Sequence, residues 1–473
     1  MRTRARYGVL FVSVVGVTAL LYLHLSSNDG HGMDQDQDKW SRQRHQLLIQ
    51  PLDDRNPKDP LYGSNRIHQL VNVAPFMGAG NKDEKGRRDH AWKGPGFLDE
   101  VKTFEEAYSN ARYLQAKRQN QPKIDRSKCT PLHNITFLKA HKTGSSTLQN
   151  IFLRFGQRHK LNFVLPPHGH HLGFPEFFSH LHMLPMDNGL YNIFCHHSRF
   201  SKYIPEIMPP NTVYISILRD PVHVFESAFT YFKIDYRLKM TDNKDAMLKF
   251  LENPSTFYIN APSLVHMRNN MLFDFGVPTI KFDDKGFIKE AIEKIDQQFS
   301  LILIAEYFEE SLILLRDVLC WRTEDMVVFK MNSRNQTSVE SLKAGIQEKI
   351  RSWNEGDVML YDHFNKTLWR KIEEYGRDKM AREVKELQDL TNSYYRLCIQ
   401  TDSADRKEGE FDLWQPPGVK INNFVLKESA RNNPICENMV RPEIVYTHEL
   451  RRAQFPKIPF RKTKRSMRRR KAL

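Results

Sequence analysis

The stretch that decides the fold is Asn134-Ile-Thr-Phe-Leu-Lys-Ala-His-Lys-Thr-Gly-Ser-Ser-Thr-Leu148. It begins with an apolar run of strand length and continues through a turn of small polar residues. The pattern predicts a buried strand, a turn and a helix from about Thr147 to Phe155, with Gly156 as its stop. The apolar residues of that helix recur at i, i+3, i+4 and i+7, the spacing of one helical face: Leu148, Ile151, Phe152 and Phe155.

A second unit of the same kind begins with the apolar run Thr212-Val-Tyr-Ile-Ser-Ile-Leu218. Arg219 follows it directly, and a helix is expected from there to about Phe232. Asp220 is a favourable N-cap for this helix, and Pro221 suits its first position.

The rest of the folded part is mainly helical, with one more apolar run of strand length at Leu301–Ile304. Buried strands that alternate with helices predict an α/β fold with a parallel sheet flanked by helices. We expect this domain over residues 129–450. Further helices are predicted over Glu309–Leu319, Val339–Trp353 and Lys366–Cys398.

The charge of the chain lies at its two ends. The 473 residues carry a formal net charge of +15, but the segment 451–473 holds eleven Lys or Arg residues and no acidic residue. Three more arginines lie within residues 1–6, so the remainder is nearly neutral. This distribution excludes a basic-faced nucleic-acid-binding domain. We expect residues 451–473 to form a solvated, disordered tail.

The first residues predict the compartment. Residues 7–25 carry no charge and are rich in Val and Leu, and as a helix they would span about 28 Å, close to the hydrocarbon core of a bilayer. Arginines before this run place residues 1–6 in the cytosol and the remainder in the lumen. The alternative is a cleaved signal peptide, but no clear cleavage site follows. We expect a membrane anchor, followed by a polar luminal stem over residues 26–128.

Sequons and cysteines agree with a secretory protein. Three N-glycosylation acceptors are predicted, at Asn134, Asn335 and Asn365, although Asn134 lies close to a predicted strand. Five cysteines predict one or two disulfides and a free thiol in an oxidising lumen. The apolar surroundings of Cys320 also allow a reduced core residue, and the sequence does not decide the pairing.

The two turns after the predicted strands can bind anions. Ligands of such sheets bind beyond the carboxyl ends of the strands. The turn His141–Thr147 offers backbone N–H groups, hydroxyls and Lys142 at a helix N-terminus, although Lys142 precedes Gly144 and the turn is not a Walker A loop. Small polar residues also begin helices for capping reasons alone.

The second turn offers a separate cationic group. Arg219 can grip a phosphate in bidentate fashion, with Ser227 two helical turns further on. The alternative is an arginine paired with Asp220 or another carboxylate. Two anion sites at separated points suit 3′-phosphoadenosine 5′-phosphosulfate, hereafter the sulfate donor, better than ATP.

Phe137-Leu-Lys-Ala-His-Lys-Thr-Gly-Ser-Ser-Thr-Leu148 and Ile217-Leu-Arg-Asp-Pro-Val-His-Val-Phe-Glu-Ser227 resemble the 5′-phosphosulfate and 3′-phosphate binding motifs of Golgi sulfotransferases. From about residue 129 to 448 the chain resembles the galactose 3-O-sulfotransferase family, type II Golgi membrane enzymes that include galactosylceramide sulfotransferase. The resemblance implies a P-loop-like sulfotransferase fold and a luminal catalytic domain. Further matching stretches are Cys195-His-His-Ser-Arg-Phe200, Ala305-Glu-Tyr-Phe-Glu-Glu-Ser-Leu312, Leu319-Cys-Trp321 and Phe364-Asn-Lys-Thr-Leu-Trp-Arg-Lys371.

The resemblance implies transfer of a sulfuryl group to the 3-hydroxyl of a terminal β-galactose on a glycolipid or a glycoprotein glycan. It assigns Arg219 and Ser227 to the 3′-phosphate of the donor, and Lys142 also to charge stabilisation. A general base must take the hydroxyl proton; His141 is our first candidate and His197 is its rival. The residues assigned to the 5′-phosphosulfate are Lys142, Thr143, Gly144, Ser145, Ser146 and Thr147.

A histidine-rich run raises the question of a metal site. Its spacing fits no standard zinc pattern and sulfuryl transfer needs no metal, so none is expected. Phe174, Phe177 and Phe178 lie among these histidines and are candidates for stacking on sugar rings or for the core. The histidines are His168, His170, His171, His180 and His182.

Three other functions share part of this pattern. A glycosyltransferase shares the anchor and stem but usually needs an acidic D-x-D site, and the D-x-D strings at Asp34–Asp38 lie in the expected stem. A noncatalytic glycan-binding protein would not need the donor lysine. Sulfotransferases for other sugar hydroxyls share the donor motifs, and only the wider resemblance argues against them. The oligomeric state is not predicted.

Overall fold

The computed structural model describes residues 97–119, 128–187, 189–240, 245–259, 262–329, 342–403 and 423–460. Its centre is a four-stranded parallel sheet in the order β2-β1-β3-β4. The α/β class with a parallel sheet is therefore confirmed. The strands are β1 Ile135–Leu138, β2 Ile193–Phe194, β3 Val213–Leu218 and β4 Leu301–Ile304, and a separate antiparallel hairpin pairs β5 Ile399–Ser403 with β6 Asn423–Leu426.

The order of the strands creates a switch point between β1 and β3. From β1 the chain moves to one side of the sheet to form β2, and from β3 it moves to the other side to form β4. Ligands of parallel sheets bind at the carboxyl ends of the strands where the order reverses in this way. Both anion-binding turns predicted from the sequence follow these two strands.

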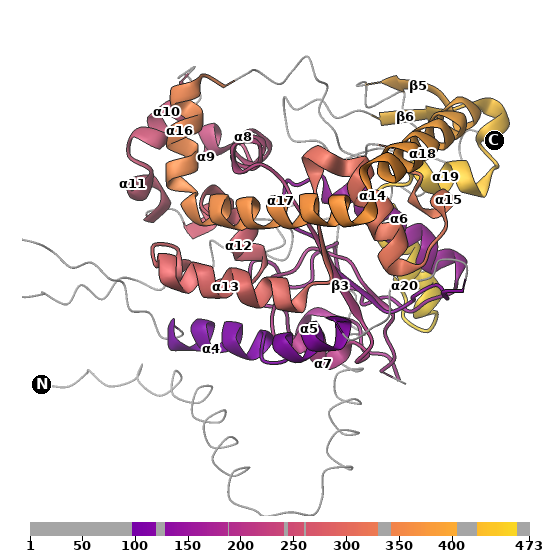
Figure 1. Ribbon diagram of the computed structural model, residues 1–473, viewed down its shortest axis with the longest axis horizontal. Helices are drawn as coiled ribbons and strands as arrows, with labels where there is room; N and C mark the ends of the chain where they lie inside the picture. The colour runs from indigo at the N-terminus through magenta and orange to yellow at the C-terminus, as the bar shows by residue number, and fades with distance from the viewer. Residues whose placement is uncertain are drawn as a thin grey trace, which may run out of the picture. The chain divides into compact units, whose positions relative to one another are not determined.

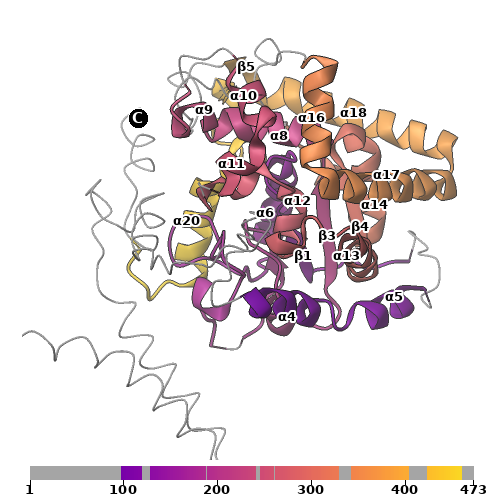
Figure 2. The same cartoon turned by 90° about the vertical axis from the view of Figure 1, so that its left-hand side faces the viewer.

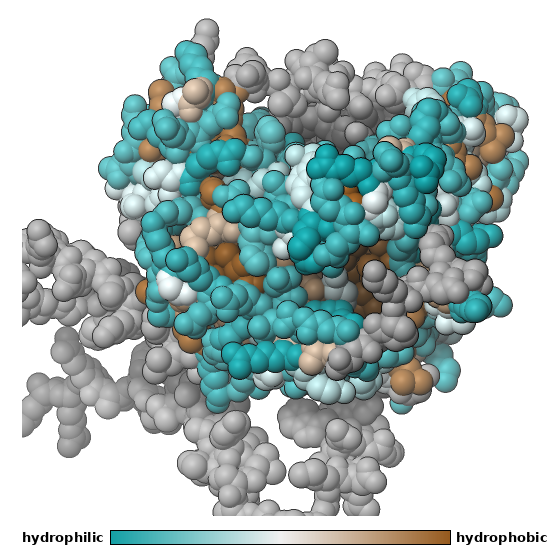
Figure 3. All heavy atoms as spheres, in the orientation of Figure 1, coloured by the Kyte–Doolittle hydropathy of each residue, from teal (hydrophilic) through white to brown (hydrophobic). Residues whose placement is uncertain are grey.

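Helices surround the sheet, and α17 and α13 run next to one another beside β4 (Figures 1 and 2). The face seen in Figure 3 is mostly hydrophilic, with small separate hydrophobic areas. The first helices are α4 Phe97–Ala107, α5 Ala111–Gln119, α6 Ser145–Arg158, α7 Tyr203–Ile207, α8 Pro221–Tyr231, α9 Ile234–Arg237, α10 Ala246–Glu252, α11 Pro254–Ile259 and α12 Asn270–Asp274, with the 3₁₀ turn η2 Pro262–Met267 before α12. The later helices are α13 Lys285–Gln298, α14 Phe308–Leu319, α15 Thr323–Met326, α16 Ala344–Trp353, α17 Glu355–Tyr375, α18 Arg377–Cys398, α19 Pro434–Val440 and α20 Glu443–Gln454.

Two predicted helix limits are wrong. Helix α6 does not stop at Gly156 but continues to Arg158. Gly156 is instead a packing residue, because a Cβ there would lie 2.3 Å from the Phe163 ring. The long helix predicted over Lys366–Cys398 is two helices, α17 and α18, which meet at Gly376 with φ +96°. The predicted cap of α8 is confirmed: the Asp220 carboxylate accepts a hydrogen bond from the Val222 N–H at 2.8 Å.

The folded body extends beyond residues 129–450 in both directions. Helices α4 and α5 lie in the segment assigned to the stem, yet they pack beside α7 and α13 at the lower edge of the body (Figures 1 and 2). Phe104 is fully buried, and the Tyr108 hydroxyl donates a hydrogen bond to the Phe275 carbonyl at 2.9 Å. At the other end, α20 continues to Gln454, and Arg451 is buried because it donates to the Gly169 carbonyl.

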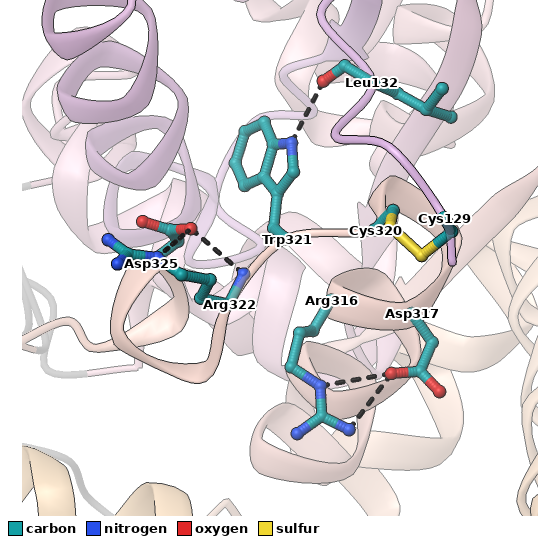
Figure 4. Close-up of a disulfide and its surroundings, with 8 residues drawn as sticks. All are labelled: Cys129, Leu132, Arg316, Asp317, Cys320, Trp321, Arg322 and Asp325. Atoms are coloured by element: carbon teal, nitrogen blue, oxygen red, sulfur yellow. Dashed lines mark hydrogen bonds and ion pairs between the residues drawn. A yellow bond between two sulfur atoms is a disulfide. The ribbon is translucent and has the colours of Figure 1, made fainter. Parts of the chain in front are cut away.

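Two disulfides and one free thiol confirm the expected use of the cysteines. Cys129 is bonded to Cys320, which joins the start of the domain to the end of α14 (Figure 4). Beside this disulfide, the Trp321 indole donates to the Leu132 carbonyl at 3.0 Å. The reduced alternative for Cys320 is therefore wrong. Cys398 is bonded to Cys436, and Cys195 is the free, buried thiol.

Several predicted features lie outside the described residues. They are the cytosolic tail and anchor over residues 1–25, the acidic strings at 34–38, the sequon at Asn335 and the basic segment from 461 onward. Among the helices of the described ranges, none has the length and apolar character needed to cross a membrane. The sequon residue Asn134 precedes β1 and is hydrogen-bonded to Asn211 and Asn192, and Asn365 lies on α17.

Candidate active site

The two predicted turns meet at the switch point of the sheet. Strands β1 and β3 are neighbours, so the turns that follow them emerge side by side. The guanidinium of Arg219 donates to the Lys142 carbonyl at 3.3 Å, which ties one turn to the other. The structure therefore brings together the lysine and the arginine that the sequence assigned to two separate anion groups.

The turn before α6 is held in shape by its own hydroxyls. Thr143 Oγ1 and Ser145 Oγ both donate to the Ala140 carbonyl, at 3.1 and 2.6 Å. Gly144 has φ +82°, a conformation that favours glycine, and open space surrounds its missing Cβ. The turn opens into the N-terminus of a 14-residue helix, where backbone N–H groups and the helix dipole favour a bound anion.

Lys142 lies above an aromatic ring from the second unit. Its Nζ is 3.4 Å from the centroid of the Tyr231 ring at the end of α8, and a cation in this position is attracted by the ring. Burial raises the pKa of Tyr231 to about 12, so the phenol is neutral near pH 7. The contact directs the Lys142 ammonium from the first turn toward the end of α8.

The Asp220 carboxylate, which follows Arg219 in the second turn, has two partners of its own. The Asp220 carboxylate accepts hydrogen bonds from Val222 N–H and, at 2.6 Å, from the Arg351 guanidinium. Ser227 lies on α8 and is buried. Arg219 and Ser227 are thus placed on the turn and the helix that follow β3, as predicted.

His141 is oriented by a buried carboxylate that the sequence analysis did not identify. Its Nδ1 lies 2.9 Å from Asp274 Oδ1, and its backbone N–H donates to Asp274 Oδ2 at 2.7 Å. Asp274 is the last residue of α12 and is fully buried. The ionised form of Asp274 accepts and does not donate, so with Asp274 ionised the proton stays on Nδ1 and Nε2 keeps its lone pair. A histidine held in this way by a carboxylate is a general base in the correct tautomer.

The rival histidine stacks directly on the first. The ring centroids of His141 and His197 are 3.8 Å apart, with an interplanar angle of 17°. His197 Nδ1 lies 2.8 Å from the Lys139 carbonyl, so its Nε2 also keeps a lone pair. Both candidate bases therefore lie at one place, but only His141 is hydrogen-bonded to a carboxylate.

Burial and neighbouring lysines keep these histidines neutral. Burial lowers the pKa of His141 well below its ordinary value, and the charges of Lys139 and Lys142 lower it further. Burial, the neighbouring His141 and Lys139 also lower the pKa of His197. Burial raises the pKa of Asp274, whereas the hydrogen bond from the backbone N–H of His141 lowers it. A neutral imidazole is the form that can accept a proton.

A buried ion pair lies beneath the turn. Lys139, at the end of β1, is fully buried, and its Nζ is 2.5 Å from Glu443 Oε2 at the start of α20. Gln149 Nε2 donates to the other carboxylate oxygen at 2.9 Å. Burial opposes ionisation of Glu443, but the Lys139 charge prevails and lowers its pKa to about 2. The C-terminal helix thus supplies the counter-charge for the centre of the site.

Sequence signals existed for two of the missed residues. Asp274 is a single acidic residue in the apolar run Met271–Phe275, and Lys139 is a single charged residue at the end of a buried strand. A charge in such surroundings needs a buried partner. No local signal identified the partner, because His141 and Asp274 are 133 residues apart and Lys139 and Glu443 are 304 residues apart.

The histidine-rich run has divided roles. Within the described ranges, no group of three or more His, Cys, Asp or Glu side chains is arranged to hold a metal ion. Phe178 is a core residue, Phe177 covers the Arg199 guanidinium, and the Phe174 ring lies 4.2 Å from His141. His171 also approaches the site, at 6.3 Å from the His141 ring. One end of this run therefore borders the candidate base.

Comparison with known proteins agrees with this geometry. Residues 103–454 match the family model described as galactose-3-O-sulfotransferase. The chain is 37% identical to galactosylceramide sulfotransferase of Bos taurus over 334 residues, which cover 68% of this chain and 79% of the relative. It is 36% identical to galactose-3-O-sulfotransferase 2 of Sus scrofa, over 70% of this chain and 86% of the relative. Galactose-3-O-sulfotransferase 3 of Homo sapiens is 33% identical, over 70% and 83%. The chain therefore belongs to the galactose-3-O-sulfotransferase family.

Proposed function

We propose that this protein transfers a sulfuryl group from 3′-phosphoadenosine 5′-phosphosulfate to the 3-hydroxyl of a terminal β-galactose. The observation that carries the proposal is the position of His141. His141 lies three residues after the end of β1, in the anion-binding turn, and its Nδ1 is 2.9 Å from Asp274 Oδ1. Membership of the family supports both the donor and the galactose acceptor.

The donor fits the two turns by charge. N–H groups at the start of α6 and the Lys142 ammonium suit the 5′-phosphosulfate, and the Thr143 and Ser145 hydroxyls hold the turn in shape around it. Arg219 suits the 3′-phosphate, because a guanidinium can bind two phosphate oxygens at once. We assign the 5′-phosphosulfate to residues 142–147 and the 3′-phosphate to Arg219 and Ser227.

In the reaction, the galactose 3-oxygen forms a bond to sulfur while the bond from sulfur to the 5′-phosphate oxygen breaks. The hydroxyl proton passes to His141 Nε2, and the leaving phosphate keeps the electron pair of the broken bond. Lys142 stabilises the negative charge that develops on that oxygen. As in phosphoryl transfer, position and charge do most of the catalysis.

We assign the base to His141 in preference to His197. Both rings are neutral and adjacent, but only the imidazolium formed at His141 would face the Asp274 carboxylate. An ion pair of this kind stabilises the protonated base. His197, which is bonded to a backbone carbonyl, is assigned to support of the His141 ring by stacking.

The test uses the full-length protein, radiolabelled donor and a panel of acceptors. The panel holds galactosylceramide, lactosylceramide, Galβ1-4GlcNAc and Galβ1-3GalNAc, each with a control blocked at the galactose 3-hydroxyl. Transfer that disappears on blocking is expected, and the preferred acceptor decides between a glycolipid and a glycoprotein glycan. Donor binding without transfer to any acceptor would reject the galactose assignment. A folded protein that binds no donor would favour the noncatalytic glycan-binding alternative.

We also propose a type II arrangement in the Golgi membrane, with residues 7–25 as the anchor and the folded body in the lumen. The uncharged run and the arginines before it support this orientation. Alkaline washing of membranes that contain the full chain should leave it in the pellet, and protease should reach the body only after the membrane is opened. Release by the wash would contradict the anchor.

A further inference from the structure

A third histidine lies beside the candidate base, and neither the sequence motifs nor the proposed mechanism use it. His266 belongs to η2, and its ring centroid is 4.5 Å from that of His141. Its two faces are covered by aromatic rings: Phe232 stacks at 4.2 Å and 6°, and Phe174 at 5.2 Å and 9°. Only the edge of the His266 ring is therefore available for polar contacts.

The hydrogen bonds of His266 fix its tautomer. Its Nδ1 lies 2.8 Å from Asn270 Oδ1, and Asn270 Nδ2 donates to the His141 carbonyl at 3.2 Å. Since the amide nitrogen of Asn270 is already a donor, its oxygen is the acceptor and His266 Nδ1 carries the proton. The lone pair of His266 is thus on Nε2.

The acceptor nitrogen of His266 is the atom of this ring that a ligand could use. Among the residues that the structure describes, none is hydrogen-bonded to Nε2 of His266. Burial lowers the pKa of His266 well below its ordinary value, and the nearby His141 lowers it further. The ring is therefore neutral, and Nε2 keeps its lone pair. A rigid acceptor in aromatic surroundings is suited to bind a hydroxyl of a ligand.

The neighbouring hydroxyls of a sugar match this pair of histidines. His141 Nε2 must accept the proton of the galactose 3-hydroxyl, and the hydroxyls at C2 and C4 flank that group. A second acceptor one ring away from the base can therefore bind a hydroxyl next to the reacting one. Sites that hydrogen-bond a substrate hydroxyl discriminate strongly against analogues that lack it, because the buried partner is left unsatisfied.

We propose that His266 Nε2 accepts a hydrogen bond from the galactose hydroxyl at C2 or C4, and that His266 determines specificity for the sugar next to the reacting position. The proposal rests on the proposed function. It assigns to His266 a role in acceptor binding and no part in proton transfer, which stays with His141.

The test compares His266→Phe with the unchanged full-length protein on three acceptors: a β-galactoside, its 2-deoxy analogue and its 4-deoxy analogue. Phenylalanine keeps the stacked ring and removes the nitrogen. In the unchanged protein, one deoxy analogue should react with a kcat/KM about 10- to 100-fold below that of the parent sugar. In His266→Phe the parent sugar should lose about the same factor, and the penalty for that analogue should disappear.

Two further variants separate recognition from packing. His266→Gln offers an amide oxygen in a similar place and should restore part of the penalty. Phe232→Leu removes a stacking ring but no hydrogen bond, so it should lower all three rates by one common factor. Donor affinity should be unchanged in His266→Phe.

If both deoxy penalties persist in His266→Phe, or if this variant lowers all three rates by one factor, the proposal is overturned and His266 is a packing residue. Where His266→Phe fails to fold, His266→Leu, which also removes the nitrogen, decides in the same way: unchanged penalties for both deoxy analogues overturn the proposal. Absence of transfer by the unchanged protein would instead reject the proposed function, so the two failures are distinguishable.

Discussion

The donor side and the base side of the site are built differently. On the donor side, the turn after β1 and the turn after β3 each hold their functional groups within a few residues, and the Lys142–Arg219 contact joins two neighbouring strands. On the base side, His141 depends on Asp274 in α12, and Lys139 depends on Glu443 in α20. Backbone N–H groups and a dipole can be supplied locally, whereas a buried charge needs a partner from a distant element.

The largest expected effect concerns the donor side. Lys142→Ala removes the charge that stabilises the leaving oxygen and should lower kcat at least about 10³-fold. Lys160→Ala is the matched control: Lys160 also has a positive φ, 54° against 62° for Lys142, but lies exposed beyond α6. Initial rates with saturating acceptor measure both. Full activity of a folded Lys142→Ala protein would reject the donor site.

On the base side, His141→Ala should lower kcat about 10²- to 10³-fold and leave donor affinity intact. Without the imidazole, the hydroxyl proton has no acceptor of suitable pKa, and general-base catalysis contributes typically 10²–10⁴-fold. Rates and donor binding by calorimetry are measured on the same sample. His197→Ala is the control and should lose less activity than His141→Ala. Loss of donor binding in His141→Ala would assign this residue to the donor turn, and a larger effect of His197→Ala would make His197 the base.

Asp274→Asn tests whether the distant carboxylate positions the base. An amide can donate to Nδ1 and so select the wrong tautomer of His141, which should lower kcat about 10²- to 10⁴-fold with little change in donor affinity. Asp274→Glu keeps the carboxylate and should restore part of the activity. Equal losses in the two variants, accompanied by a lower melting temperature, would indicate a structural role alone.

The sequence predicted the strand, turn and helix units of the proposed donor side, because each unit is local. A strand, a turn and a helix face can be read from apolar spacing. This placed Lys142, Gly144 and Arg219 beyond the carboxyl ends of the correct strands, and Ser227 on the helix that follows β3. The ends of the helices were predicted less well. Gly156 was expected to end α6, but a glycine is needed there because the Phe163 ring packs against it.

The base side was predicted only in part. His141 and His197 were both identified, but the choice between them depends on Asp274, which no spacing rule connects to residue 141. The body was also expected to end at 450, although one face of α20 holds Glu443, Thr447 and Arg451 against the site region. Contacts of this kind depend on the path of the chain and not on local pattern.

Glu443→Gln tests the second long-range contact through stability. Removal of one partner leaves the Lys139 ammonium buried and unpaired, which costs about 3–5 kcal/mol. Glu449→Gln on the same helix is the control: Glu449 is a third exposed, its partner Arg441 also approaches Glu437, and about 1 kcal/mol or less is expected. Urea denaturation measures both.

The loss of stability in Glu443→Gln should depend on pH. Because the pKa of Glu443 is about 2 in the folded protein, the difference in unfolding free energy from the unchanged protein should persist down to about pH 4.5 and shrink as the pH falls below it. Equal stability of the two variants at neutral pH would contradict a pair that matters for folding.

The smallest expected effect is a shift of the pH profile of kcat/KM. This profile depends on both sides of the site, because Lys142 on the donor side lowers the pKa of His141 on the base side. His141 acts as a base only when neutral, so the rate falls as the pH falls through its pKa, which lies well below 6.5 because burial, Lys139 and Lys142 oppose the added charge. The acidic limb of kcat/KM should therefore lie below pH 6.5. The anionic charge of Glu443 raises the pKa of His141, and in Glu443→Gln the limb should move to still lower pH, by less than one unit. A limb that moves to higher pH in this variant would show that the Lys139–Glu443 pair does not set the charge felt by His141.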